Sequence, residues 1–345
     1  MKALLLKQYM ELEVAEMPEP ALGPNDVLVR VRACGICGSD IHGLDGSSGR
    51  RIPPLVMGHE ASGVIAKVGR EVSGWAVGDR VAFDSMVSCG RCHFCRRGEI
   101  NYCDNRQVLG VSCGDYRRHG AFAEFVAVPS NILYKLPDAL PFEHAAMLEP
   151  ISIAVHAVNL TPREMGDTAV VVGSGMIGQL TIQAAKLAGF ARVFAVDIDD
   201  AKLEMARRLG ADEVFNSKTC DAPAEVAART NGRGADAVLE AVGATDPVRT
   251  AILCARKGGT VTLIGNVTPN IEISLQQVVT REIRLQGSCG QQGEYQACID
   301  LLASGKICVE PMISARVPLD EAANWFHRLY NHEPNLMKVM VEPWR

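Results

Sequence analysis

The chain of 345 residues lacks a long apolar run and an excess of charge of either sign. Its most apolar stretch, residues 168–190, is interrupted by glycines and polar residues, whereas a membrane span needs about 20 continuous apolar residues. The first ten residues, MKALLLKQYM, lack the apolar core and the cleavage site of a signal peptide. Thirty-five basic and 40 acidic residues give a net charge of -5 with no basic run, which disfavours a nucleic-acid partner. We expect a soluble, cytoplasmic protein without membrane or nucleic-acid partners.

The chain is also too long for a single core, because cores stop growing near roughly 250 to 300 residues. Before residue 150, short β-like runs such as DVLVRVRAC alternate with turn residues. After it, apolar runs such as TAVVV alternate with amphipathic segments of helical period, the pattern of βαβ units in a parallel sheet. From about Gly290 two helices and an apolar strand, LMKVMVEP, follow. The pattern therefore predicts a β-rich domain, a doubly wound α/β domain and a closing segment that fits either.

Four cysteines, Cys89, Cys92, Cys95 and Cys103, lie in one short polar segment with the spacing CxxCxxCx7C. Four thiolates close a tetrahedral structural zinc site. A reducing compartment disfavours disulfides, and the spacing matches neither common iron–sulfur pattern, although an iron–sulfur cluster or a vacant site stays open. We therefore predict a structural zinc, which leaves no open position for chemistry.

A catalytic zinc needs three protein ligands and one open position. Candidate ligands and nearby polar groups occur in three segments, and they are Cys37, Ser39, Asp40, His42, His59, Glu60, Glu149 and His156. Cys37 and His59 are the first two candidate ligands of such a site, and a carboxylate is the third. Taken singly, each of these residues also has a structural explanation, and Cys34 with Cys37 could be a plain CxxC pair.

Gly173, Gly175 and Gly178 form GxGxxG directly after an apolar strand and at the start of a helix. Asp197 ends the next strand, 19 residues beyond Gly178. Glycines in this context let the backbone approach a pyrophosphate at a helix N-terminus. Asp197 would accept hydrogen bonds from the ribose hydroxyls and repel a 2′-phosphate, so we predict NAD(H) rather than NADP(H). Alternatively, Asp197 only caps the following helix.

Taken together, CGICGSDIHG, GHEASG with GDRVAF, the four-cysteine lobe, EPISIAVHA and the glycine motif resemble the zinc-dependent medium-chain dehydrogenases over essentially the whole chain. The segment PFEHAAMLEPISIAVHA is most similar to the polyol (sorbitol) dehydrogenase branch. The resemblance implies a GroES-like catalytic domain (1–152) with a structural zinc lobe (about 86–106), a Rossmann NAD-binding domain (153–289), and a C-terminal segment (290–345) that returns to the catalytic domain. It also implies an active site in the cleft between the two domains.

The resemblance assigns Cys37, His59 and a carboxylate to a catalytic zinc, and leaves open whether Glu60 or Glu149 binds directly, through water or in exchange. Ser39 would take the substrate proton and His42 would pass it to solvent by way of the nicotinamide ribose, while Asp40 orients a ligand. The cofactor contacts that we expect are Gly173, Gly175, Met176, Ile177, Gly178, Asp197, Lys202, Val242, Ile264 and Ser288. Two zinc ions per chain and NAD(H) are the expected cofactors.

The implied reaction is oxidation of a secondary alcohol of a polyol such as sorbitol or xylitol to a ketose. The segment LQGSCGQQGEY has Ser288, Cys289, Gly290 and Gln291 where animal sorbitol dehydrogenases have an aromatic and arginine pair, which weakens sorbitol itself. Arg117 or Arg118 could instead bind a substrate carboxylate, so an aldonate such as L-gulonate or L-galactonate is the second hypothesis and L-threonine the third. Cys289 could lie near the nicotinamide.

Two other classes stay open: a non-catalytic protein that only binds NAD(H), and a zinc module that contacts nucleic acid. Intact Cys37, His59, Glu149 and Ser39 argue against the first, and the net charge argues against the second. Relatives form dimers or tetramers through an edge of the Rossmann sheet, so we expect a homodimer or homotetramer. The remaining cysteines, Cys34, Cys113, Cys220, Cys254, Cys289, Cys298 and Cys308, we interpret as free thiols that mostly pack.

Overall fold

The computed structural model describes residues 1–113 and 116–345, without the side chains of Cys113, Tyr116 and Arg117. Unit 1 comprises Met1–Glu149, Tyr295–Ala303 and Val309–Arg345, and unit 2 comprises Pro150–Glu294 and Ser304–Cys308. Of the predicted C-terminal segment 290–345, residues 295–303 and 309–345 fold with the N-terminal part of the chain, whereas 290–294 and 304–308 fold with unit 2. No helix in the described ranges is long and apolar enough to cross a membrane.

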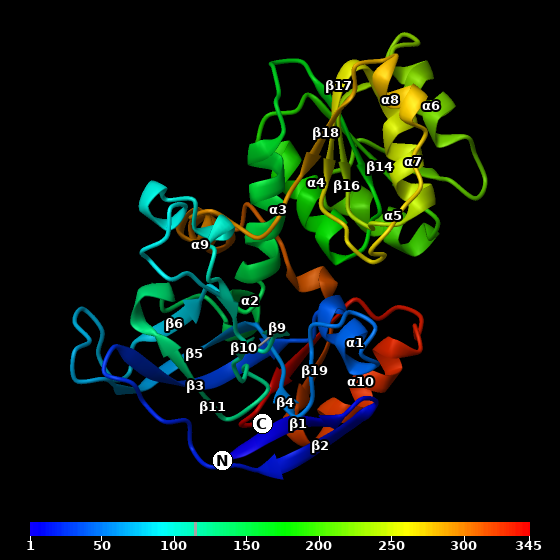
Figure 1. The fold of residues 1–345 in the computed structure, drawn as a ribbon. Helices are drawn as coiled ribbons and strands as arrows, with labels where there is room; N and C mark the ends of the chain where they lie inside the picture. Colours follow the sequence, from blue (N-terminus) through cyan, green and yellow to red (C-terminus); the bar gives the residue numbers. More distant parts are fainter. Residues whose placement is uncertain (114–115) are drawn as a thin grey trace. The chain divides into compact units, whose positions relative to one another are not determined.

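Unit 1 is built on a sheet with the strand order β12-β6-β5-β3-β20-β19, and β11 also pairs with β3. A smaller sheet has the order β2-β1-β4. The strands are β1 (Lys2–Gln8), β2 (Glu11–Glu16), β3 (Asp26–Gly35), β4 (Leu55–Val56), β5 (Glu60–Val68), β6 (Arg80–Phe83), β7 (Met86–Val87), β8 (Gln107–Val108), β9 (Ser112–Cys113), β10 (Tyr116–Arg117), β11 (Phe125–Pro129), β12 (Leu133–Lys135), β19 (Ile313–Pro318) and β20 (Lys338–Glu342). The helices are α1 (Gly38–Leu44), α2 (Phe142–Ala145), α9 (Tyr295–Ala303) and α10 (Ala322–Tyr330) (Figure 1).

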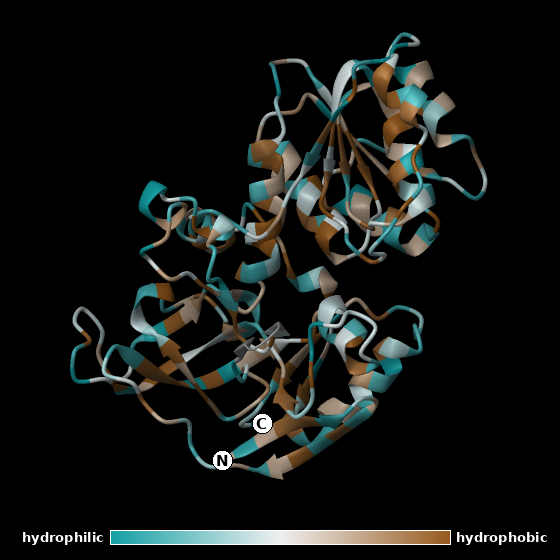
Figure 2. Ribbon diagram, viewed as in Figure 1, coloured by the Kyte–Doolittle hydropathy of each residue, from teal (hydrophilic) through white to brown (hydrophobic). Residues whose placement is uncertain are grey.

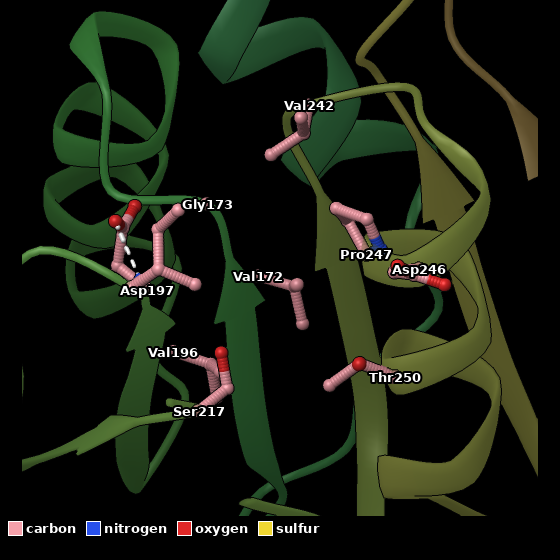
Figure 3. Close-up of a pocket in the computed structure, with 10 residues that line it drawn as sticks. Val172, Gly173, Val196, Asp197, Ser217, Val242, Asp246, Pro247 and Thr250 are labelled. Atoms are coloured by element: carbon pink, nitrogen blue, oxygen red, sulfur yellow. Dashed lines mark hydrogen bonds between the residues drawn. The ribbon is translucent and has the colours of Figure 1, made fainter. Parts of the chain in front are cut away.

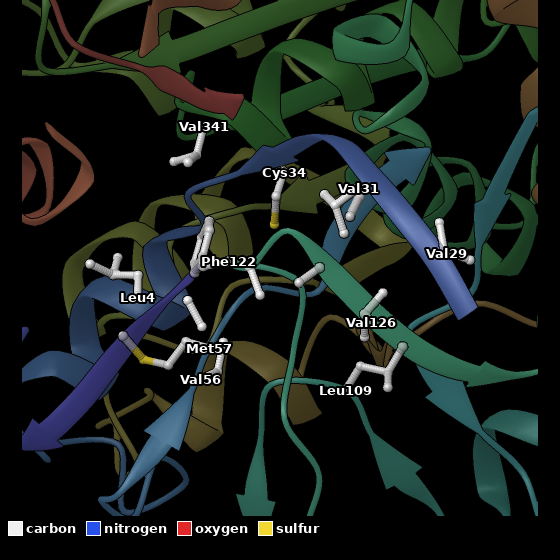
Figure 4. Packing of buried hydrophobic residues seen from close by; sticks show 14 of the residues in the cluster. Leu4, Val29, Val31, Cys34, Val56, Met57, Leu109, Phe122, Val126 and Val341 are labelled. Atoms are coloured by element: carbon white, nitrogen blue, oxygen red, sulfur yellow. The ribbon is translucent and has the colours of Figure 1, made fainter. Parts of the chain in front are cut away.

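The core of unit 1 forms where alternate residues of β3 face inward. Val29, Val31 and Phe122 are fully buried, and Cys34 lies with them in the same cluster (Figure 4). Cys34 is 0% exposed, and burial raises its pKa well above the usual thiol range. The expected packing role of Cys34 therefore agrees with its position, because its sulfur contributes to the apolar core.

Unit 2 contains a six-stranded parallel sheet with the order β15-β14-β13-β16-β17-β18. Its strands are β13 (Thr168–Val172), β14 (Arg192–Asp197), β15 (Glu213–Asn216), β16 (Ala235–Glu240), β17 (Ala255–Leu263) and β18 (Arg284–Gly287). The helices are α4 (Met176–Leu187), α5 (Asp200–Arg208), α6 (Ala222–Arg229), α7 (Thr245–Cys254) and α8 (Leu275–Val279), and α3 (Leu148–Leu160) enters the unit from Glu149.

Both faces of this sheet are covered. Val170 and Val172 of β13 pack with residues of α6 and α7, whereas Ala169 and Val171 pack with residues of α3 and α4. Every residue of β13 is consequently buried, and this central strand is predominantly apolar (Figure 2). The predicted fold class, a doubly wound parallel sheet together with a β-rich domain, is confirmed.

Candidate metal centres and dinucleotide site

Strand pairing in unit 1 brings the two segments of the first candidate metal centre together. β3 ends at Gly35, which pairs with Glu60, the first residue of the antiparallel strand β5. Two residues after Gly35, Cys37 caps the N-terminus of α1. Ligand atoms of Cys37, His59 and Glu60 consequently lie within 4.8 Å of one another. A thiolate, an imidazole and a carboxylate are the donor set that suits a catalytic zinc.

Asp40 is a buried carboxylate that contacts two of the three residues of this cluster, Cys37 and His59. Its Oδ2 accepts a hydrogen bond from the Cys37 backbone N–H (3.3 Å), and its Oδ1 lies 3.4 Å from His59 Nδ1. Burial alone would raise the pKa of Asp40, but His59 and then Arg51 outweigh burial and hold it at about 2. Burial alone would lower the pKa of His59, but Asp40 raises it well above the usual range. With Nδ1 directed at a carboxylate, the other ring nitrogen of His59 is available to a metal.

Lys338 supplies a buried cation at the same centre. Its Nζ lies 2.5 Å from Glu60 Oε2 and donates to the Ile36 carbonyl at 3.1 Å. The two side chains are 3% and 1% exposed. Burial alone would lower the pKa of Lys338, but Glu60 raises it. The negative charge of Glu60 is therefore balanced even without a metal.

Glu149 is close to this centre but is not part of the cluster of three. Burial raises the pKa of Glu149 to about 7, and the charges of His59, Glu60 and Lys338 act on it. Of the two carboxylates that the sequence left open, the structure places Glu60 with Cys37 and His59. Direct, water-mediated or alternating binding by Glu149 stays a prediction.

Two candidate relay groups lie on α1. Ser39 is exposed, and its Oγ accepts a hydrogen bond from Arg51 Nη2 at 3.0 Å. His42 is half-buried one turn further along the helix. Ser39 is thus in the first turn of α1 and His42 in its last turn, and both side chains are at least partly open to solvent. His156, by contrast, lies in unit 2, where its Nδ1 is 2.8 Å from Glu294 Oε1.

The four lobe cysteines form a second centre, with their sulfur atoms within 4.8 Å of one another. Backbone N–H groups are directed at these sulfurs: Cys89 donates to Cys103 Sγ at 3.2 Å, and Cys95 donates to Cys92 Sγ at 3.5 Å. The N–H groups of Arg91 and Cys92 lower the pKa of Cys89 to about 6, whereas burial raises the pKa of Cys103 to about 12. Four convergent sulfurs with N–H donors fit a structural zinc.

In unit 2 the glycine motif lies between β13 and α4. A Cβ on Gly178 would overlap the Gly173 backbone, so the helix packs against the loop at a distance that only glycine allows. Gly173 has φ +91°, and no atom lies within 4 Å of a Cβ built on Gly175, the N-cap of the 12-residue helix α4. Free backbone N–H groups beside open space fit a pyrophosphate.

A pocket of about 160 Å³ adjoins this loop (Figure 3). Asp197 lies on one wall, and Pro247 and Thr250 lie on the other. Asp197 Oδ2 accepts from Ser174 N at 2.6 Å, and its Oδ1 accepts from Ile198 N at 2.7 Å. The pocket includes the predicted Gly173, Asp197 and Val242 and seven residues that sequence reasoning missed: Val172, Val196, Ile198, Ser217, Asp246, Pro247 and Thr250.

The other predicted cofactor residues occupy different positions in unit 2. Met176, Ile177 and Gly178 form the first turn of α4. Lys202 lies on α5 with its Nζ 4.0 Å from Asp199 Oδ2. Ile264 N donates to the Glu240 carbonyl, and the Ser288 Oγ is buried with no hydrogen-bond partner in the described part of the chain. These six residues do not line the pocket, and their contacts with the cofactor remain predictions.

The predicted substrate residues are only partly described. The side chain of Arg117 lies outside the described residues. Arg118 is half-buried, and its Nη1 is buried without a hydrogen-bond partner among the described residues. Cys289 is exposed in unit 2. Sequence reasoning missed Arg51 and Lys338, although a single lysine in the apolar run LMKVMVEP was a usable signal.

The chain is similar to known zinc-binding dehydrogenases along most of its length. Residues 23–138 match the alcohol dehydrogenase GroES-like domain, and residues 177–304 match the zinc-binding dehydrogenase family. Sorbitol dehydrogenase of Bacillus subtilis (strain 168) is 32% identical over 349 residues, covering 100% of this chain and 98% of the relative. L-idonate 5-dehydrogenase of Vitis vinifera is 37% identical over 304 residues, covering 86% of this chain and 82% of the relative.

A solved structure is similar along the whole chain. The zinc-binding dehydrogenase of Sinorhizobium meliloti 1021, bound to NADP, has a TM-score of 0.90 and 34% identity, with 99% of each chain covered. Its match extends over both units, the β-rich unit with the two candidate metal centres and the unit with the candidate dinucleotide pocket.

Proposed function

The chain belongs to the zinc-binding dehydrogenases with a GroES-like domain, in the polyol branch, and within that branch we propose that it oxidises a secondary hydroxyl of a sugar alcohol such as xylitol or sorbitol to a ketose, with NAD+ as the acceptor. The observation that carries this proposal is the convergence of Cys37, His59 and Glu60 beside an exposed serine. One soft and two harder donors suit alcohol chemistry more than structural support, because a zinc ion with three protein ligands keeps a fourth position for substrate.

Bound at this centre, zinc would supply a Lewis acid that makes the substrate hydroxyl more acidic. The protein side chains then move the proton. Ser39 accepts the hydroxyl proton and passes its own proton on toward His42, and NAD+, when bound in unit 2, would supply the acceptor for the hydride. Asp40 keeps His59 and Cys37 in place, and Lys338 balances the charge of Glu60.

Support for NAD+ over NADP+ comes from the Asp197 side of the pocket. Both carboxylate oxygens of Asp197 accept backbone N–H bonds, so the negative charge is held at the end of β14. The next residue is the exposed Ile198 rather than an arginine that would bind a 2′-phosphate. A 2′-phosphate would meet a fixed carboxylate there without a cation in the adjacent backbone turn.

A sugar acid is the second candidate substrate, and one observation favours it. Arg118 has a buried guanidinium nitrogen, Nη1, with no hydrogen-bond partner in the described ranges, and a carboxylate would satisfy it. The Vitis vinifera relative is named as an idonate dehydrogenase. Arg118→Met should then lower kcat/KM for an aldonate about 10- to 100-fold and leave kcat/KM for xylitol unchanged.

The test is NADH formation with a panel of polyols, aldonates, L-threonine and simple alcohols, with and without a zinc chelator. Metal content is measured on the same samples. Chelator-sensitive turnover of a polyol, with zinc at both centres, would support the proposal. Turnover of aldonates alone would favour the second candidate, and zinc only in the cysteine lobe with no turnover would contradict a catalytic role for Cys37 and His59.

We also propose that the chain forms a homodimer or homotetramer through the β18 edge of the parallel sheet. β18 is an edge strand, and the segment before it exposes large apolar side chains, namely Val267, Ile271, Ile273, Leu275 and Val279. Light scattering coupled to size-exclusion chromatography tests the assembly. Leu275→Lys should dissociate it, whereas the control Met165→Lys, at a fully exposed methionine of the same unit, should not. A monomeric wild type would contradict this proposal.

A further inference from the structure

We propose that Arg51 is a positioning residue for the proton step: it fixes the orientation of the Ser39 hydroxyl, so that Ser39 can accept a proton from the substrate while donating its own. This inference rests on the proposed role of Ser39. No sequence motif drew attention to Arg51, which lies in a polar stretch between α1 and β4.

Arg51 is a buried arginine that reaches an exposed serine. Its side chain is 4% exposed. One nitrogen, Nη2, donates to Ser39 Oγ at 3.0 Å and to Asp40 Oδ1 at 3.0 Å. The same guanidinium group therefore connects the relay serine with the carboxylate that orients His59 and Cys37.

The surrounding chain is built to hold this side chain. A Cβ on Gly43 of α1 would lie 2.9 Å from Arg51 Cβ and 3.2 Å from its Cδ, so the helix leaves a slot that an alanine would close. The backbone on either side of Arg51 is held by one buried residue: Ser112 N donates to the Arg50 carbonyl at 2.8 Å, and Ile52 N donates to Ser112 Oγ at 2.7 Å.

Charge balance alone does not account for this arrangement. Pairing with Asp40 would neutralise Arg51 without any contact to Ser39. Meanwhile Arg51 Nε is buried with no hydrogen-bond partner among the described residues, and leaving a buried donor unsatisfied is unfavourable. The guanidinium is thus oriented with Nη2 between Ser39 and Asp40 although another of its donors stays unsatisfied.

The consequence for Ser39 follows from donor and acceptor counts. A guanidinium group only donates, whereas a hydroxyl has one hydrogen and two acceptor positions. Because Arg51 occupies one acceptor position of Ser39, the hydroxyl hydrogen points away from Arg51. One acceptor position and one hydrogen remain on the exposed side. As the substrate O–H bond breaks, its proton bonds to Oγ, and the original Ser39 proton leaves toward His42, so Ser39 stays neutral.

The test is a double-mutant cycle on the zinc-loaded enzyme: Arg51→Met, Ser39→Ala and both together, with the best polyol of the panel. Proton transfer by a positioned side chain contributes roughly 100- to 10,000-fold. We expect Arg51→Met to lower kcat about 10- to 100-fold, part of that contribution, with KM for NAD+ unchanged. In the Ser39→Ala background we expect less than about a 2-fold further loss, because two residues that act through one group are not additive.

Two further readouts separate positioning from structural support. Zinc content and NADH affinity, the latter by fluorescence titration, should be unchanged in Arg51→Met. The solvent deuterium isotope effect on kcat should rise as the proton step becomes limiting, and Arg51→Lys should recover part of kcat. Gly43→Ala displaces Arg51 without removing its charge and should reproduce the kcat loss and the isotope effect. If Arg51→Met does not fold, the double-mutant cycle is run with Gly43→Ala in place of Arg51→Met, and the same outcomes test the inference.

The outcomes discriminate as follows. An equal loss in both backgrounds, or loss of zinc in Arg51→Met, would overturn the inference, because Arg51 would then act through Asp40 or the fold. Full activity of Arg51→Met beside a strong loss in Ser39→Ala would overturn the inference and leave the proposed function standing. Full activity of Ser39→Ala would contradict the proposed proton relay through Ser39, and with it the positioning role of Arg51.

Discussion

Substituting Lys338 by methionine would remove the buried cation that faces Glu60 at the first metal centre. Lys338 Nζ lies 2.5 Å from Glu60 Oε2, and both side chains are at most 3% exposed. Methionine fills a similar volume, so the change is chiefly one of charge. In the metal-free protein Glu60 would be left as a buried carboxylate without its cation, and the Ile36 carbonyl would lose its donor.

The expected magnitude follows from this burial. Removing one partner of a buried ion pair costs about 3 to 5 kcal/mol, because the remaining charge is uncompensated. A unit of this size loses roughly 2 to 4 °C in Tm per kcal/mol, so the metal-free variant should melt roughly 6 to 20 °C lower. With zinc bound beside Glu60, the metal supplies a positive charge in place of Lys338. The loss of stability on Lys338→Met should then be smaller in zinc-loaded than in metal-free protein. The difference between these two losses reports how directly Glu60 binds the metal.

The assay is urea unfolding near pH 8, followed by circular dichroism, for chelated and zinc-loaded protein. The control Lys135→Met breaks an exposed pair with Asp79, in which Lys135 is 70% exposed, and should cost at most about 1 kcal/mol. The double variant Glu60→Gln with Lys338→Met should recover much of the loss.

One result would refute the reasoning. If the metal-free Lys338→Met protein unfolds within about 1 kcal/mol of wild type, as expected only for an exposed pair, the charge of Glu60 does not depend on Lys338. Groups other than Lys338 would then stabilise the Glu60 carboxylate, and its proposed place among the metal ligands would lose its electrostatic basis.

Three other predictions concern the remaining sites. Asp197→Ser should raise KM for NAD+ about 10- to 100-fold, since charged hydrogen bonds contribute roughly 1.5 to 3 kcal/mol. Steady-state kinetics should also show a smaller ratio of kcat/KM for NAD+ to kcat/KM for NADP+. Cys92→Ser should lose the lobe zinc in elemental analysis while the other centre keeps its metal, because three thiolates no longer close the tetrahedron. Burial raises the pKa of Glu149 to about 7, so in metal-free protein its contribution to stability is complete below about pH 4.5 and falls as pH rises through 7, by up to about 3 kcal/mol. Glu149→Gln should flatten that decline in urea unfolding at about pH 5 and pH 8, and an unchanged slope would contradict it.

Local features were predictable because neighbouring residues determine them. The lobe cysteines lie within one short segment, and their sulfurs meet as the CxxC spacing indicated. The apolar run before Gly173 formed β13, and the helix after Gly175 began where the glycine motif placed it. In each of these cases the partners are a few residues apart, so propensity and spacing were sufficient.

Long-range partners were not predictable in the same way. Lys338 meets Glu60 across 278 residues because β20 pairs with β3 and β3 pairs with β5, a register that no local pattern encodes. The choice of Glu60 rather than Glu149 beside Cys37 and His59 depends on the same register. Pocket residues such as Thr250 are contributed by α7, and only the stacking of helices on the sheet brings them opposite Asp197.

The amino-acid sequence by itself thus determined the fold class and predicted the two metal-ligand segments and the phosphate loop, because short-range spacing and periodicity specify them. Only the tertiary structure brought Glu60 within 4.8 Å of Cys37 and His59, and buried the cations Arg51 and Lys338 around them. The physical reason is that strand register and helix packing select these neighbours through burial and charge pairing, and both depend on residues far apart in the chain.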